Sequence, residues 1–277
     1  MNFKNNKLYI LLFAAAMAFS CNKPAQNDKN EKHSRQASEN RTENISKANK
    51  NTTAEILAKH QIPVLCYHRI TNEVKSDYAV TPETFNAHMK MLADSGYHSI
   101  LPDQLYDYLV FNKALPEKPF LITFDDSRAE HIGIAAPAME KFGFRGTFFI
   151  MTITYNKKNY MTTDQIAQLA KAGHTIGLHS WDHTMATKYK EDADWQKQVE
   201  APKKKLETII GRNVDYWAYP NGVSNHESAA KLDKYFKLSF ILSTKRDSLL
   251  PLQTVRRIIV PDYSAQRLLK SMRESFK

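Results

Sequence analysis

The stretch PFLITFDDSRAEH, residues 119–131, joins a short apolar run to two adjacent aspartates. Residues 120–124 are mostly apolar, which is typical of a buried strand, and Asp125 and Asp126 follow directly. Neighbouring carboxylates repel each other, and a carboxylate at the end of a buried strand is costly to remove from water. The pair therefore predicts a nearby cation at the end of this strand.

Similar apolar runs occur along the chain, and helix-like segments separate them. They are IPVLCYH, GTFFI, HTIGLH, DYWAYP, LSFILS and RRIIV, which begin at residues 62, 146, 174, 215, 238 and 256. This alternation indicates a parallel sheet with crossover helices. About seven or eight such units in about 220 residues predict an α/β fold of the deformed or incomplete β/α barrel type. An open doubly wound sheet is the alternative.

The first 54 residues are expected to lie outside this domain. Residues 1–20 contain two lysines and then an apolar run, residues 8–19, which is too short for a mature transmembrane helix and predicts a signal peptide. The run ends in AFSC, which resembles a bacterial lipoprotein cleavage site with a lipid on Cys21. Residues 21–54 are polar and predict a flexible tether, and residues 55–277 form the folded domain.

This organisation predicts an exported lipoprotein that is anchored to a membrane of the cell envelope. The folded domain is expected on the periplasmic or the surface face of that membrane. An ordinary signal peptide with an incidental cysteine is the alternative. Only Cys21 and Cys66 are present, so an acylated Cys21 leaves no internal disulfide, and Cys66 is expected to be a small buried residue. The net charge of +10 comes from scattered lysines without interleaved aromatics, which favours solvated lysines over nucleic-acid binding.

Acids and imidazoles follow several of the predicted strands, where function collects in parallel α/β folds. His179 and His183 are four residues apart, and on a helical turn their rings lie on one side. With one carboxylate they offer three ligands and leave room for water, which is the open arrangement of a catalytic metal in hydrolysis. One aspartate of the pair can then bind the metal while the other faces the water. Two separate surface histidines and a helix-capping aspartate are the alternatives.

The motifs TFDDS, HSWDH and WAYPNG, in this order, resemble the signature motifs of NodB-type polysaccharide deacetylases, carbohydrate esterase family four. The opening PVLCYHRI resembles the subgroup that deacetylates poly-β-1,6-N-acetylglucosamine. The resemblance covers about residues 60–265. It implies a deformed β/α barrel as the catalytic domain and a divalent metal on Asp126, His179 and His183. Zn²⁺ suits these ligands, as do Ni²⁺, Co²⁺ and Fe²⁺.

The resemblance also implies the catalytic roles. Asp125 is expected to be the general base for the attacking water, and the backbone N–H of Asn221 to stabilise the oxyanion. Ala218 stands where many members have an arginine, so Arg257 is expected to hold Asp125, with Arg256 as its rival. The usual late histidine is missing, and His68 is expected to protonate the leaving amine. A hydrogen-bonded core histidine is the alternative for His68.

Aromatic residues near these motifs are candidates for stacking on sugar rings, namely Trp181, Trp217 and Tyr219. The expected activity is the hydrolysis of N-acetyl groups from an exported or cell-surface N-acetylglucosamine polymer. Peptidoglycan or chitin-like oligomers are alternative substrates. A glycan-binding lipoprotein with little turnover is the main alternative function, and a metal phosphodiesterase is a weaker one because no arginine cluster or second acidic set is evident.

Overall fold

The computed structural model describes residues 50–276. The predicted signal peptide, Cys21 and most of the predicted tether lie outside the described residues. Asn51 already donates hydrogen bonds to the carbonyl groups of Val110 (2.7 Å) and Leu109 (2.7 Å), and Thr52 caps helix α2, Thr53–Ala58. The domain therefore begins a few residues before the expected boundary at residue 55. None of the helices in residues 50–276 has the length and apolar character needed to cross a membrane.

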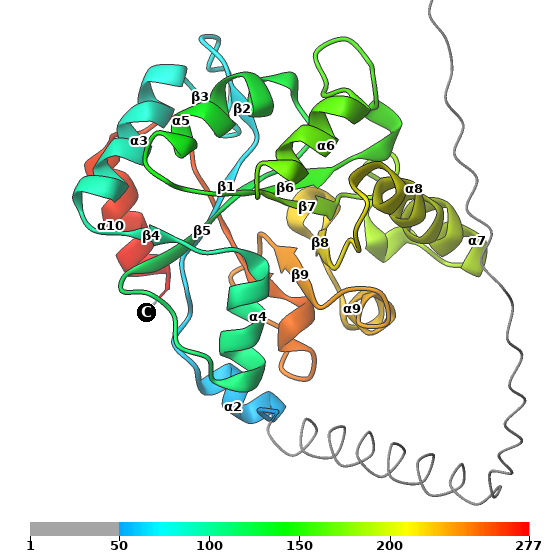
Figure 1. Cartoon of the computed structure of the whole chain (residues 1–277). Helices are drawn as coiled ribbons and strands as arrows, with labels where there is room; N and C mark the ends of the chain where they lie inside the picture. Colours follow the sequence, from blue (N-terminus) through cyan, green and yellow to red (C-terminus); the bar gives the residue numbers. More distant parts are fainter. Residues whose placement is uncertain (1–49, 277) are drawn as a thin grey trace, which may run out of the picture. The chain divides into compact units, whose positions relative to one another are not determined.

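Eight short parallel strands form a nearly closed barrel (Figure 1), which confirms the predicted fold class. In spatial order they are β10 (Val255–Arg256), β9 (Leu238–Ile241), β8 (Tyr216–Ala218), β7 (Thr175–Leu178), β6 (Thr147–Ile150), β5 (Pro119–Phe124), β1 (Val64–Tyr67) and β11 (Ile258–Ile259). The strands β10 and β11 are successive parts of one segment. β10 pairs with β9 and β11 pairs with β1, so residues 255–259 join the two sides of the barrel.

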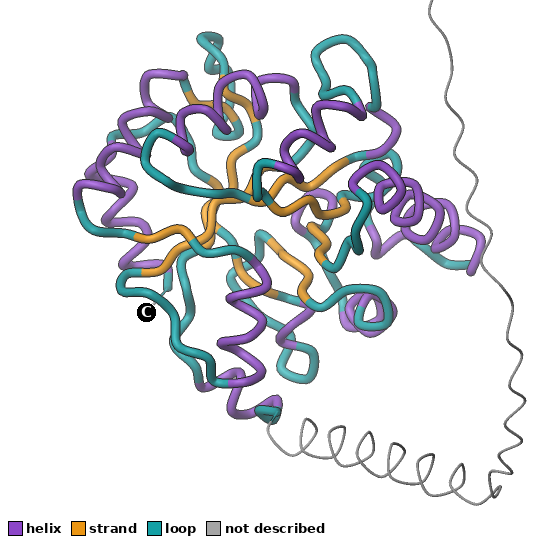
Figure 2. The backbone as a smooth tube through the Cα atoms, viewed as in Figure 1, coloured by secondary structure: helices purple, strands orange, loops and turns teal. Residues whose placement is uncertain are grey.

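Helices surround the strands (Figure 2) and lie between them in the sequence, as the alternation of segments predicts. Thr81 and Thr162 are N-caps, and Gly96 and Gly173 follow the helix ends with positive φ. The other helices and minor strands are α3 (Pro82–Asp94), α4 (Pro102–Phe111), α5 (Ala136–Glu140), α6 (Thr163–Lys171), α7 (Asp192–Trp195), α8 (Ala201–Ile210), α9 (His226–Leu232), α10 (Ala265–Ser275), β2 (Arg69–Ile70), β3 (Ala79–Val80) and β4 (His98–Ser99). Single π-helical turns, His131–Ala135 and Gln196–Glu200, precede α5 and α8.

Alternate strand residues enter two separate parts of the core. In β5, Ile122 and Phe124 pack in the larger cluster with residues of the surrounding helices, whereas Leu121 belongs to a second cluster with Val64 and Phe149 of neighbouring strands. This is the two-residue period of a strand, with one face toward the helices and the other toward the barrel axis. Asp125 continues the Leu121 series, so the period directs its side chain toward the barrel interior.

Candidate active site

Five polar or ionisable residues of the interior series meet at the carboxyl ends of the strands. Cys66 and His68 continue the Val64 series of β1, His179 follows β7, and Arg257 lies between β10 and β11. A cleft with a volume of about 280 Å³ opens above them. Its lining residues are His68, Arg69, Tyr78, Asp125, Asp126, Arg128, His179, His183, Asn221, Gly222 and Leu242.

Asp125 is held by a buried ion pair with Arg257. The Nη1 atom of Arg257 donates to Oδ1 of Asp125 at 2.7 Å, and Nη2 donates to Oδ2 at 2.8 Å. Nη1 also donates to the hydroxyl of Thr123 at 3.1 Å. Burial alone would raise the pKa of Asp125, but the charge of Arg257 and the imidazole of His179 outweigh it and hold the pKa well below its usual range. Asp125 is therefore an ionised carboxylate with a fixed orientation.

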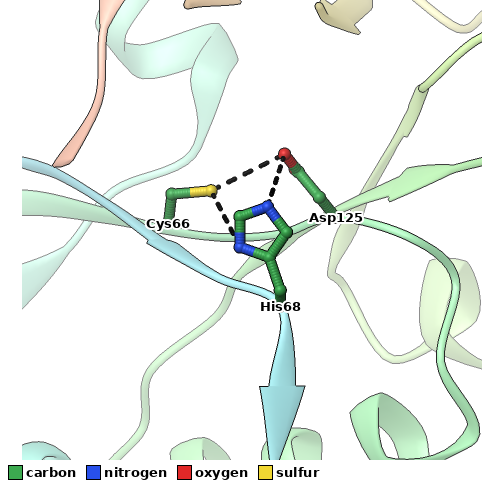
Figure 3. A group of neighbouring side chains, drawn as sticks. All are labelled: Cys66, His68 and Asp125. Carbon is green, nitrogen blue, oxygen red and sulfur yellow. Dashed lines mark hydrogen bonds and ion pairs between the residues drawn. The ribbon is translucent and has the colours of Figure 1, made fainter. Parts of the chain in front are cut away.

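Cys66, His68 and Asp125 converge beneath the cleft (Figure 3). The thiol of Cys66 donates to Oδ2 of Asp125 at 3.6 Å, and Nε2 of His68 lies 3.8 Å from the same oxygen. Burial raises the pKa of Cys66, so it remains a neutral thiol. Burial also lowers the pKa of His68, against the opposing effect of Asp125, which favours the neutral imidazole. His68 is only 9% exposed but still reaches the cleft.

Asp126, His179 and His183 form a second group with the geometry of a metal site. Oδ1 of Asp126 lies 3.7 Å from Nε2 of both His179 and His183. The Nδ1 atom of His179 donates to the carbonyl of Ala218 at 2.8 Å, which leaves the lone pair of Nε2 directed toward the group. Two imidazole nitrogens and one carboxylate at this spacing fit one divalent ion with bonds of about 2.0–2.2 Å.

The two histidines approach each other by a route that differs from the predicted helical turn. Residues after β7 form a loop in which Ser180 (φ 65°) and His183 (φ 71°) have positive φ. The two rings nevertheless lie 4.9 Å apart between centroids. Asp126 (φ 72°) and Asn221 (φ 58°) also have left-handed backbone conformations at the cleft. Such conformations are uncommon outside glycine, although Asp, Asn and His adopt them more readily than other residues, and three of the residues that have them here line the cleft.

The third motif supplies one wall of the cleft. Asn221 lines it, beside Gly222, whose φ is 67°. A Cβ atom on Gly222 would lie 2.3 Å from Cβ of Leu242, so no larger residue fits without displacing that wall. Arg257 takes the place expected beside Asp125, whereas Arg256 points elsewhere and donates to Gln61 at 3.2 Å.

The predicted stacking residues are not at the cleft. Trp217 and Tyr219 are 0% exposed, and the prediction that they bind sugar was wrong. They follow the helix-facing series of β8, since Tyr216 and Ala218 belong to the barrel interior. Trp181 is half-buried, but it lines a different pocket and lies under Lys197, whose Nζ is 4.5 Å from the ring centroid.

Several cleft residues carried no clear signal in the sequence. Tyr78 is 47% exposed and packs edge-to-face on His68 with centroids 4.8 Å apart. Arg69 and Arg128 line the cleft, and His131 donates from Nε2 to the carbonyl of His68 at 2.6 Å. Cys66 is buried, as expected, and it also donates a hydrogen bond to Asp125, which the sequence did not indicate. Arg128 is placed by an antiparallel bridge with Tyr160, and Tyr78 lies in the loop before β3. Both positions depend on tertiary contacts.

Comparison with known proteins agrees with this geometry. Residues 112–236 match the family model described as polysaccharide deacetylase. YxkH of Bacillus subtilis, named for the same family, is 29% identical over 174 residues, which are 63% of this chain and 61% of YxkH. A chitin deacetylase of Arthroderma benhamiae is 27% identical over 49% of this chain and 37% of its own. The chain thus spans less than two thirds of the length of these relatives.

Solved structures share the fold. A Streptococcus pyogenes deacetylase, PplD, in complex with acetate superposes with a TM-score of 0.68 at 24% identity, covering 76% of this chain and 98% of PplD. IcaB from Ammonifex degensii superposes with a TM-score of 0.63 at 24% identity, covering 77% of this chain and 97% of IcaB. The part of the chain that matches the polysaccharide deacetylase family model, residues 112–236, includes the double aspartate, the two histidines and the third motif.

Proposed function

We propose that this chain is a metal-dependent hydrolase that removes N-acetyl groups from an exported or cell-surface N-acetylglucosamine polymer. One observation carries the proposal: the ionised Asp125, fixed by Arg257, lies beside the group of Asp126, His179 and His183 in one cleft. A pure binding site needs no second carboxylate held apart from the three ligands. The match to the polysaccharide deacetylase family supports amide hydrolysis as the reaction.

The residues of the second group would hold the ion. A divalent cation held by these residues would polarise the acetamide carbonyl and lower the pKa of water. We propose Zn²⁺ as this ion, and the same donors accept Ni²⁺, Co²⁺ or Fe²⁺.

The chain's own residues would perform the proton transfers. Asp125 accepts a proton from the attacking water, and its two hydrogen bonds from Arg257 keep the carboxylate in place. His68 donates a proton to the departing amine nitrogen as the C–N bond breaks, so acetate and a free amine leave. Since the neutral imidazole is favoured, His68 first receives that proton, and Oδ2 of Asp125 is 3.8 Å away. The backbone N–H of Asn221 is the proposed donor to the carbonyl oxygen.

Poly-β-1,6-N-acetylglucosamine is the proposed substrate. The Tyr67–His68 opening, with His68 at the cleft, supports this subgroup. The match to a relative named chitin deacetylase makes 1,4-linked oligomers the alternative substrate. A glycan-binding protein without turnover is disfavoured, because Arg257 replaces the arginine that is missing at Ala218.

Acetate release tests the proposal directly. The full chain is incubated with β-1,6- and β-1,4-linked N-acetylglucosamine pentamers, with and without a chelator, and released acetate is measured. We expect release from the 1,6-linked pentamer, loss with chelator, and recovery when one of the four metals is restored. Binding of either pentamer without acetate release under any metal would favour the binding protein instead.

A lipid on Cys21 is the proposed anchor, which would hold the enzyme at a membrane of the cell envelope. The observation behind it is the apolar run at residues 8–19 followed by AFSC. Cys21→Ser should release the protein from membranes in cell fractionation while the specific activity stays the same. A Cys21→Ser protein that still sediments with membranes would refute this anchor.

A further inference from the structure

Cys66 is a buried polar residue at the active site, and the proposed reaction gives it no role. Its side chain is 0% exposed and lies in β1, beside His68 and Asp125 (Figure 3). The Sγ atom is 3.6 Å from Oδ2 of Asp125 and 3.9 Å from Nδ1 of His68. Among residues 50–276, Nδ1 of His68 has no other hydrogen-bond partner. The thiol is therefore the group that the Nδ1 side of the His68 ring contacts.

The single proton of the thiol decides the direction of these two contacts. An ionised carboxylate is a better acceptor than a neutral imidazole nitrogen, and Oδ2 of Asp125 is also the nearer of the two. The thiol stays protonated because burial raises the pKa of Cys66. With its proton directed to Asp125, the sulfur presents only lone pairs to His68. Nδ1 of His68 must then carry the ring proton and donate it to Sγ.

The surroundings of His68 hold its ring in this orientation. Tyr78 packs against the ring with an interplanar angle of 82°. The backbone carbonyl of His68 accepts a hydrogen bond from Nε2 of His131 at 2.6 Å, which holds the chain next to the ring. Because Cys66 is fully buried, solvent cannot take the place of the sulfur. An N–H group left without an acceptor at such a position is costly, so the tautomer depends on Sγ.

We propose that Cys66 is a positioning residue, which fixes His68 in its Nδ1–H tautomer and keeps the lone pair of Nε2 free on the side of Asp125. The consequence for catalysis rests on the proposed function. Nε2 takes up the proton that Oδ2 of Asp125, 3.8 Å away, has accepted from the attacking water, and passes it to the departing amine. The Nε2–H tautomer has no lone pair at that atom and could not accept the proton. No bond to Cys66 forms or breaks.

Nitrogen NMR of the full chain tests the tautomer directly. With ¹⁵N-labelled histidine, long-range ¹H–¹⁵N spectra distinguish a protonated ring nitrogen from one with a lone pair, and the His68 signals are identified by their loss in His68→Gln. At about pH 8, where the imidazole is neutral, we expect Nδ1 of His68 to carry the proton. Cys66→Ala should convert His68 to the Nε2–H tautomer, whereas Cys66→Ser keeps a group that can both donate and accept and should retain Nδ1–H. An Nε2–H tautomer in the unaltered chain, or Nδ1–H retained in Cys66→Ala, would overturn the proposal.

Kinetics of the same variants separate positioning from packing. In Cys66→Ala, Asp125 keeps both hydrogen bonds from Arg257, so the general base stays in place. We expect kcat for acetate release to fall by about 10-fold with KM unchanged, and Cys66→Ser to recover most of this loss. On an activated acetyl ester, which needs little acid assistance, the loss in Cys66→Ala should be much smaller.

Val64→Ala is the matched control. Val64 is also fully buried and lies on the same face of β1, but it is not a residue of the cleft, so its kcat should stay the same. Thermal melts establish that each variant is folded. Equal losses of Cys66→Ala on amide and ester, or an equal loss in Val64→Ala, would make Cys66 a packing residue. If the unaltered chain releases no acetate, the proposed function fails, and the NMR spectra still decide the tautomer.

Discussion

The two ends of the barrel differ in the pairing of their charged side chains and in their backbone conformation. At the carboxyl end, Asp125 is fully paired with Arg257, and the backbone of Asp126 and His183 is left-handed. At the amino end, Gly96 and Gly173 follow helices α3 and α6 with the left-handed conformation that is usual for glycine, and Arg246 and Arg256 form no ion pair with a carboxylate of residues 50–276. Local sequence preferences predict the backbone where residues serve only the fold. They fail where reactive groups are brought together.

The largest effect should come from the carboxylate that is not a proposed ligand. Asp125→Asn should lower kcat by about 10⁴-fold, the upper end for a general base, because the proton acceptor and the partner of Arg257 are lost together. Metal content should stay the same when the purified protein is analysed for bound metal. A metal-free Asp125→Asn protein would show that Asp125 is a ligand and that the roles of the two aspartates are exchanged.

His68 sharpens the same comparison, because it is buried like a core histidine but reaches the cleft. His68→Ala should lower kcat on the glycan amide by about 10²–10⁴-fold with little change in KM. An activated acetyl ester needs little acid assistance, so the loss should be much smaller on that substrate.

His88→Gln is the matched control for His68. His88 is also buried, but it bonds to Tyr67 (3.1 Å) and to the carbonyl of Tyr263 (2.7 Å), outside the cleft. We expect its kcat to be almost unchanged. Equal losses of His68→Ala on amide and ester would make His68 a structural residue.

Variants of two adjacent arginines give the most direct comparison between the carboxyl and amino ends of the barrel. Arg257→Met leaves Asp125 as an unpaired buried charge and should lower the free energy of unfolding by about 3–5 kcal/mol, together with activity. Arg256→Met removes a half-buried cation without an ion pair in residues 50–276 and should cost far less. Denaturant unfolding of both variants measures the difference. Similar losses in both would contradict the assignment of Arg257 as the partner of Asp125.

The smallest effect concerns His174, a buried residue just before β7. Its Nδ1 atom accepts from the N–H of Gly146 at 3.0 Å, and burial lowers its pKa despite the hydrogen bond to Glu140. The unfolded chain therefore takes up a proton first as the pH falls below about 6.5, and stability declines from there down to the folded pKa. His174→Gln should show a shallower decline of unfolding free energy between pH 6.5 and 5. Parallel pH profiles would exclude this linkage.

The sequence predicted most of the fold because strand and helix signals are local. The apolar runs lie where the structure has strands, and the segments between them are helices. Strand-end position also brought the double aspartate, the histidine pair and His68 to one cleft. Strand-end position did not predict where Trp217 and Tyr219 lie, because the sequence of the third motif does not say which face of β8 points to the barrel axis. The positions of Tyr78 and Arg128 depend on loops from distant segments, which have no local signal.

The segment at residues 255–259 joins β9 to β1 and carries Arg257 between its two pairings. β1 is the first barrel strand in chain order, and this segment follows all the other barrel strands. Until it docks, Asp125 has no cation beside it and the barrel is open on one side. The proposed enzyme therefore acquires its fixed carboxylate only after this segment has docked, so chains cut before residue 255 would be inactive toward glycan.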